Sequence, residues 1–179
     1  MATPTTAAEL TEAISGTKSW TLDPAGSSVR IHGKSIWNLV KVNGAFGTVT
    51  GEGSVQADGA ASGTLTIDAA SIDTKQGKRD KHLRSKDFFD VENHPSIVFN
   101  AAKIVARSGQ EAEVTGELVV LGVAKPLGFT AKVSEASAEA VALTAELTVD
   151  RYDFGMKFNQ LGMMGHLFQV EISARFVAA

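Results

Sequence analysis

The chain has 179 residues, which is an ordinary length for one domain and enough to bury a substantial core. Its net charge of −3 excludes the excess of Lys and Arg that wholesale nucleic-acid binding requires. The absence of cysteine excludes disulfides, thiolate zinc sites, iron–sulfur clusters and cysteine nucleophiles.

The first segment, residues 1–17, predicts a short amphipathic helix that is loosely attached. Thr6 and Glu9 have the spacing of a capping box, and Leu10 and Ile14 lie four residues apart. The segment lacks the basic start and apolar run of a secretory signal, and no stretch approaches the roughly 20 apolar residues of a membrane span. We therefore expect a cytoplasmic protein with a helical extension over 1–17 and one β domain over 18–179.

Alternation of apolar and polar residues dominates the rest of the chain. It is clearest over residues 141–150 and 169–176, and it covers 114–120 and 127–133 less strictly. Antiparallel sheets with one wet face produce this pattern, whereas parallel sheets buried on both faces do not. Asn-Gly, Asp-Gly and Ser-Gly turns separate successive runs. The pattern predicts an all-β sandwich or barrel of about eight strands.

Residues 74–90 interrupt this rhythm with a polar, highly charged segment, for which we predict a helical turn or two near 78–85. Its basic residues allow two interpretations. Lys78, Arg79 and Arg84 could receive an anionic headgroup. Alternatively, the segment is a solvated loop whose arginines pair with nearby carboxylates, which is the interpretation that we favour.

The residue types that catalysis and metal binding need do not converge in the sequence. The four histidines are scattered without an i,i+4 pair, and no Gly-x-Ser-x-Gly elbow is present. We predict no catalytic residue, no metal site and no cofactor.

A Met-rich apolar segment lies between the alternating runs 141–150 and 169–176. Met156, Met163, Met164 and Phe168 lie among glycines there. Methionine adapts to irregular apolar shapes, so the segment could form a pliable opening for an apolar ligand. It could equally be an ordinary loop that plugs the end of the barrel, and the sequence leaves both interpretations open.

Small residues occupy mid-strand positions that the period of two assigns to the interior: Gly116, Ala131, Ala145 and Ala174. If they cluster, an eight-stranded barrel has room for a small ligand. A dry void of about 300 Å³ would cost about 7 kcal/mol, so a molecule should occupy it. Alternatively, Phe99, Phe129 and Phe176 reach across and fill the space.

Several segments, taken in order, resemble the YceI family of lipocalin-like barrel proteins over roughly residues 18–177. They are Trp20–Asp23, Gly44–Phe46, Ser71–Thr74, Arg79–Leu83, Asp87–Asp90, His94-Pro95, Gly116–Leu118, Leu121–Pro126 and Arg151–Gly155. The resemblance implies an antiparallel up-and-down barrel whose lumen holds a polyisoprenoid, an isoprenoid quinone or a fatty-acyl chain.

The leading hypothesis is non-catalytic binding, transport or storage of such a long apolar lipid. We expect the lumen to be lined by Phe46, Leu65, Ile67, Phe99, Leu118, Phe129, Leu143, Leu147 and Phe176. Met156, Met163, Met164 and Phe168 would then lie near an opening. One alternative is an isomerase or cyclase that uses the lumen as a mould. The other is a ligand-free stress-response or interaction module. We expect no nucleic-acid partner, and the sequence leaves a homodimer open.

Overall fold

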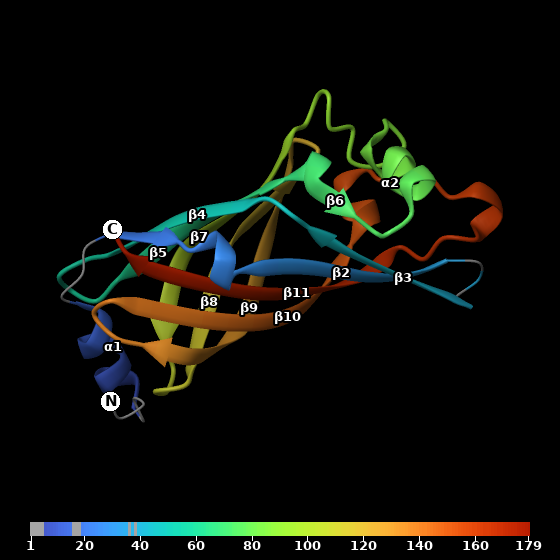
Figure 1. The fold of residues 1–179 in the computed structure, drawn as a ribbon. Coiled ribbons are helices and arrows are strands. Elements are labelled where there is room, and N and C mark those ends of the chain that lie inside the picture. Colours follow the sequence, from blue (N-terminus) through green and yellow to red (C-terminus); the bar gives the residue numbers. More distant parts are fainter. Residues whose placement is uncertain (1–5, 16–18, 36, 38) are drawn as a thin grey trace.

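The computed structural model describes residues 6–15, 19–35, 37 and 39–179. Its elements run along the chain as shown in Figure 1. In order they are α1 (Ala7–Ser15), β1 (Ser19–Leu22), η1 (Pro24–Gly26), β2 (Ser28–Ser35), β3 (Val40–Phe46), β4 (Val49–Val55), β5 (Ala61–Asp68), η2 (Ala69–Ser71), β6 (Ile72–Asp73), α2 (Gly77–Arg84), β7 (Ser96–Ala106), β8 (Glu111–Val120), β9 (Val123–Ala136), β10 (Ala140–Asp150), η3 (Arg151–Phe154), η4 (Gln160–Gly162) and β11 (Leu167–Ala178).

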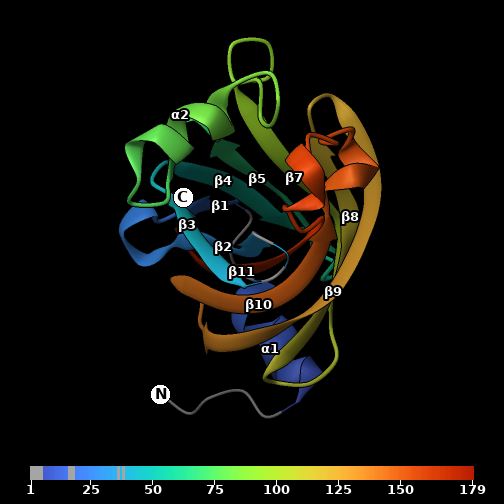
Figure 2. The same cartoon turned by 90° about the vertical axis from the view of Figure 1, so that its right-hand side faces the viewer.

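The strands close into an antiparallel barrel, as the sequence predicts. Eight strands form the ring, in the order β1, β4, β5, β7, β8, β9, β10 and β11, and β11 pairs back onto β1. β2 and β3 extend this ring toward one end, because β2 continues β1 after η1 and β3 leads directly into β4. Figure 2 looks along the axis and shows the strands surrounding a common centre.

The two helices lie at opposite ends of the barrel (Figure 1). At one end, α1 begins with the predicted capping box, in which the Thr6 amide donates to Glu9 Oε2 at 2.8 Å and the Glu9 amide donates to Thr6 Oγ1 at 3.2 Å. The expectation of loose attachment is wrong, because Leu10 is only 3% exposed and packs against Ala112 and Val133. At the other end, α2 lies within residues 74–90 and begins and ends one residue before the helical turn predicted near 78–85.

Several deeply buried side chains lie at the α2 end, in the segments that connect the strands of the ring. Ile72, Phe88 and Phe154 are 0%, 2% and 4% exposed there, and all three belong to one apolar cluster. They follow β5, α2 and β10 in the chain. The excursions between strands therefore contribute core residues that the alternating pattern alone does not identify.

The structure requires glycine at position 116 for a steric reason. From the sequence, Gly116 was instead interpreted as space for a ligand. A Cβ atom at this position would lie 2.0 Å from the carbonyl oxygen of Asn100 and 2.9 Å from Cα of Ala101. The pairing of β7 with β8 shifts register between Ala101 and Lys103. Glycine is required because the bulged backbone of β7 approaches β8 closely, a common use of glycine inside a sheet.

We predict that Gly116→Ala destabilises the fold by about 1–3 kcal/mol, because the added methyl group displaces the backbone of β7. Gly128→Ala on the neighbouring strand is the matched control, since its Cβ would meet nothing closer than 3.5 Å. The control should be neutral or slightly stabilising, because alanine is favoured over glycine in a strand. Urea unfolding of the two variants measures the difference. Equal midpoints would contradict the steric explanation.

Candidate functional site

The interior of the barrel contains two adjoining apolar cavities. The larger, the α2-end cavity, has a volume of about 330 Å³ and is lined by strands, α2, η3 and the segment before β11. The smaller, the α1-end cavity, has a volume of about 160 Å³ and extends to α1. Four side chains line both cavities: Leu65, Phe99, Phe129 and Ile172. These four residues mark the boundary between the two halves of the lumen.

A pair of aromatic rings narrows the lumen at this boundary. The ring centroids of Phe99 and Phe129 lie 5.5 Å apart, with an angle of 43° between the ring planes. The two interpretations of the sequence are therefore both partly correct. Space exists on either side of the waist, and phenylalanine side chains reach into the waist itself.

Each residue predicted to line the lumen borders at least one cavity. Phe46, Ile67, Leu118 and Leu147 border the α2-end cavity, Leu143 and Phe176 border the α1-end cavity, and Leu65, Phe99 and Phe129 border both. Three of the predicted small residues, Ala131, Ala145 and Ala174, line the α1-end cavity. Most of these positions were assigned from the period of two, which rests on successive side chains of a strand pointing to opposite faces.

The floor of the α1-end cavity comes from a segment for which we predicted no role. Leu10, Thr11 and Ile14 of α1 line it. The signal in the sequence was the i,i+4 spacing of Leu10 and Ile14, which identifies an apolar stripe but not the surface that the stripe covers. α1 closes this end of the lumen.

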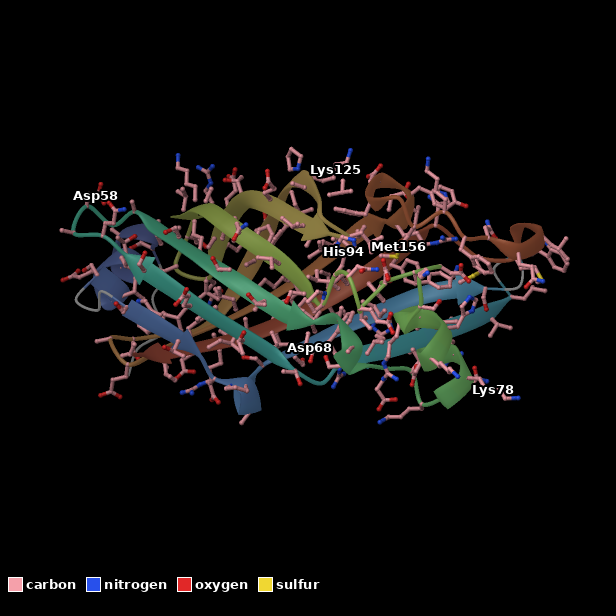
Figure 3. The ribbon with its side chains drawn as sticks, turned by 90° about the horizontal axis from the view of Figure 1, so that it is seen from above. Asp58, Asp68, Lys78, His94, Lys125 and Met156 are labelled. Atoms are coloured by element: carbon pink, nitrogen blue, oxygen red, sulfur yellow. The ribbon has the colours of Figure 1, made fainter. Side chains whose placement is uncertain are left out.

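The Met-rich segment covers part of the opposite end. Met156 is 7% exposed and lines the α2-end cavity together with Met164 and Phe168. Met163 instead lines a groove on the outside, beside Trp37 and His166. Three of the four residues predicted to lie near an opening thus border the α2-end cavity, and two of them, Met164 and Phe168, also line the outer groove. Figure 3 shows Met156 close to the loop after η3.

The three basic residues of 74–90 have different surroundings. Lys78 is exposed and points away from the barrel (Figure 3). Arg84 donates from Nε and Nη2 to the carbonyl oxygens of Ala70 and Ile72, each at 2.8 Å. Arg79 donates to the side chain and carbonyl of Thr74 at 2.7 and 2.8 Å and lines the α2-end cavity. The arginines thus bond to carbonyl and hydroxyl oxygens, whereas the interpretation that we favoured pairs them with carboxylates.

A second arginine, Arg151, also lines the α2-end cavity, and it was not identified as a site residue from the sequence. It is 3% exposed, although it carries a charge. Its Nε donates to the carbonyl of Gly165 at 2.9 Å and its Nη1 donates to the carbonyl of Met156. Burial lowers the pKa of Arg151, and the neighbouring Tyr152 and Asp150 oppose this shift. An arginine nevertheless stays protonated at neutral pH.

One histidine also borders the α2-end cavity. His82 of α2 lies 2.8 Å from the carboxylate of Asp87 through Nε2, and its ring meets those of Phe88 and Phe158 edge to face. The inward strand positions named in the sequence analysis contain no titratable residue. His82 instead belongs to helix α2. Across the described ranges, no three or more His, Asp or Glu side chains gather into a metal-binding group.

None of the helices in the described segments combines the length and apolar character needed to cross a membrane.

Comparison with known proteins gives a family match over most of the chain. The YceI-like domain matches residues 20–176. A UPF0312 protein of Staphylococcus aureus, SAS2572, is 30% identical over 170 residues, which cover 88% of this chain and 96% of that protein. The UPF0312 protein plu2095 of Photorhabdus laumondii is 44% identical, but over only 69 residues, which cover 38% of this chain and 35% of that protein.

Solved structures share the fold. BcnA of Burkholderia cenocepacia superimposes with a TM-score of 0.76 at 23% identity, covering 86% of this chain and 98% of that one. A polyisoprenoid binding domain from Saccharophagus degradans superimposes with a TM-score of 0.71 at 15% identity, covering 89% of this chain and 98% of that one. The match over 20–176 and the shared barrel lead to one conclusion: the chain belongs to the YceI-like family.

Proposed function

We propose that this protein binds one long apolar molecule inside its barrel and carries or stores it without altering it. The observation that supports this most directly is the pair of adjoining apolar cavities along the barrel axis. A single chain that passes the waist of Phe99 and Phe129 would occupy both cavities. The polyisoprenoid binding domain with the same fold supports an isoprenoid chain as one candidate.

The energetic cost of an empty lumen favours an occupant. At about 24 cal/mol per Å³, leaving the α2-end cavity of about 330 Å³ dry would cost about 8 kcal/mol. That figure is comparable to the whole stability of a typical domain, about 5–15 kcal/mol. Water is a poor occupant because cavities with apolar linings tend to remain dry. An alkyl or prenyl chain instead gains about 0.8 kcal/mol for each methylene that it buries.

The placement of charge suggests how such a molecule would lie. Arg79 borders the α2-end cavity, whereas Lys78 and Arg84 do not. We therefore propose that the polar end of the ligand lies at the α2 end, with Arg79 as its contact among the three basic residues named from the sequence. The apolar tail would extend past the waist toward α1. Met156, Met164 and Phe168 would cover the chain near its polar end.

Enzymatic activity on a lipid in the lumen is the second candidate, and the His82–Asp87 pair is the observation that favours it. A histidine held by a carboxylate is a common general base. The pair is half exposed and lies at the cavity border, which supports a role in packing α2 more than one in chemistry. If the carrier proposal is right, lipid recovered from His82→Ala will be chemically identical to lipid from the unaltered protein.

The central test is extraction of purified protein with organic solvent, followed by mass spectrometry. We expect one isoprenoid or acyl species at a stoichiometry near one per chain. Removal of the lipid should lower the melting temperature, because the ligand stabilises only the folded state. A lipid-free extract from several expression hosts, with unchanged melting after solvent treatment, would favour the ligand-free module. Fractionation of the native host tests the cytoplasmic location expected from the sequence.

A second test uses a substitution that fills part of the lumen. Ala131 is 2% exposed and lines the α1-end cavity, so Ala131→Phe should fill much of its volume of about 160 Å³. We expect the affinity for eicosanoate to fall at least about tenfold, since two methylenes left in water cost about 1.6 kcal/mol. The affinity for decanoate, which is short enough for the other cavity, should change little.

The matched control is Thr130→Phe, which places the same side chain on the adjacent, exposed position of β9. It should bind both chains as the unaltered protein does. An equal loss for the two chain lengths in Ala131→Phe, or a loss in the control, would argue against a tail in the α1-end cavity.

A further inference from the structure

The wall of the α2-end cavity includes an arginine with one buried donor that has no partner in the described part of the chain. Arg151 lines this cavity, and its Nη2 is buried without a hydrogen-bond partner among the described residues. Its other two donor atoms are satisfied by the carbonyl oxygens of Gly165 and Met156. A buried donor left unpaired is costly, and a buried charge is costlier still, so a group of this kind calls for a partner.

The surroundings keep Arg151 charged, but no carboxylate of the described residues forms an ion pair with it, and Asp150 acts on it only through a longer-range charge interaction. Its guanidinium carbon lies 4.8 Å from the ring centroid of Tyr152 and 5.8 Å from that of Phe88. Aromatic faces stabilise a cation but do not neutralise it. The nearest carboxylate in sequence, Asp150, instead accepts from the Tyr152 amide at 2.9 Å and lies 2.9 Å from His166.

The whole cavity lining repeats this imbalance of charge. Its described residues include Lys34, Arg79 and Arg151, together with His82, whose partner Asp87 lies outside the lining, and they include neither Asp nor Glu. This is not an average property of the protein, whose net charge is −3. Positive charge is therefore concentrated at one end of an otherwise apolar lumen.

Building on the function proposed above, we propose that Arg151 is the anchor for an anionic oxygen headgroup, a carboxylate or a phosphate, on the long-chain ligand. The headgroup supplies the acceptor that Nη2 lacks and the negative charge that the cavity lacks. Arg79 contributes a second positive charge from α2. Hydrogen bonds between ionised partners are about twice as strong as neutral ones, and a guanidinium binds carboxylate and phosphate in the same planar geometry. The ligand class is thus an acidic lipid rather than a neutral one.

The experiment compares matched ligands on delipidated protein. Hexadecanoate is paired with hexadecanol, and geranylgeranyl phosphate with geranylgeraniol, so that each pair differs only in its headgroup. We expect the unaltered protein to bind each anion at least about tenfold more tightly than its alcohol. Arg151→Gln should reduce this ratio to near one while the alcohols still bind, and Arg151→Lys should restore part of it because it keeps the charge.

The control is Arg84→Gln, which removes an arginine of the same end that bonds to two carbonyl oxygens and does not line the cavity. It should leave the ratio unchanged. Circular dichroism checks that Arg151→Gln folds. If that variant does not fold, the ligand pairs on the unaltered protein and on Arg151→Lys still decide the matter.

The outcomes separate the inference from the function on which it rests. Equal affinity for acid and alcohol in the unaltered protein would overturn the anionic headgroup and leave a neutral lipid carrier. A ratio that survives Arg151→Gln would overturn Arg151 as the anchor. A preference for only one of the two anions would identify which headgroup the site accepts. Failure of all four ligands to bind would instead overturn the proposed function itself.

Discussion

The lumen exists because one long strand closes the sheet on two partners. β11 pairs with β1 through its last residues and with β2 through its middle, so it joins both halves of an interrupted strand. The interruption at η1 is held by Arg175 of β11, whose carbonyl accepts from the Asp23 amide at 2.7 Å. Its guanidinium lies 3.1 Å from Asp23 and 3.0 Å from Glu135 of β9. These bonds cross three strands on the outer face and leave the inner face apolar.

Closure also determines where polar chemistry can occur. A closed antiparallel barrel turns alternate side chains inward, and an apolar interior excludes ionised groups from those positions. Arg79, His82 and Arg151, which border the α2-end cavity, accordingly come from α2 and η3, and among the described basic lining residues Lys34 alone belongs to a strand, near the end of β2. Under the proposed function, the barrel would supply volume and the segments between strands would supply specificity.

Local patterns were enough to predict an all-β fold and which strand positions point inward. Thr130 and Ala131 illustrate why, since one is exposed and the next is buried, as the pleat of a strand requires. The capping box of α1 was equally local. The resemblance to YceI proteins resolved the choice between sandwich and barrel, which the alternation left open, because both architectures have one wet face per sheet.

Features that depend on contacts distant in sequence could not be predicted. Leu10 packs against Ala112 and Val133, more than 100 residues away, so its burial was hidden. Gly116 was interpreted as space for a ligand because the bulge that requires it lies on another strand. Arg151 follows an alternating strand and looked like the polar start of a turn. Only the folded arrangement shows that Phe88, Met156 and Gly165 enclose it.

If the barrel carries a long ligand as proposed, the aromatic waist would affect how fast that ligand exchanges. Phe99 and Phe129 lie between the two cavities, so a chain that extends through both must displace their rings to enter and again to leave. Rotation of packed rings is an activated step that depends on the surrounding core. For a long ligand, dwell time inside the barrel would then follow the mobility of two phenylalanines, and short ligands that stop before the waist would exchange faster at equal affinity.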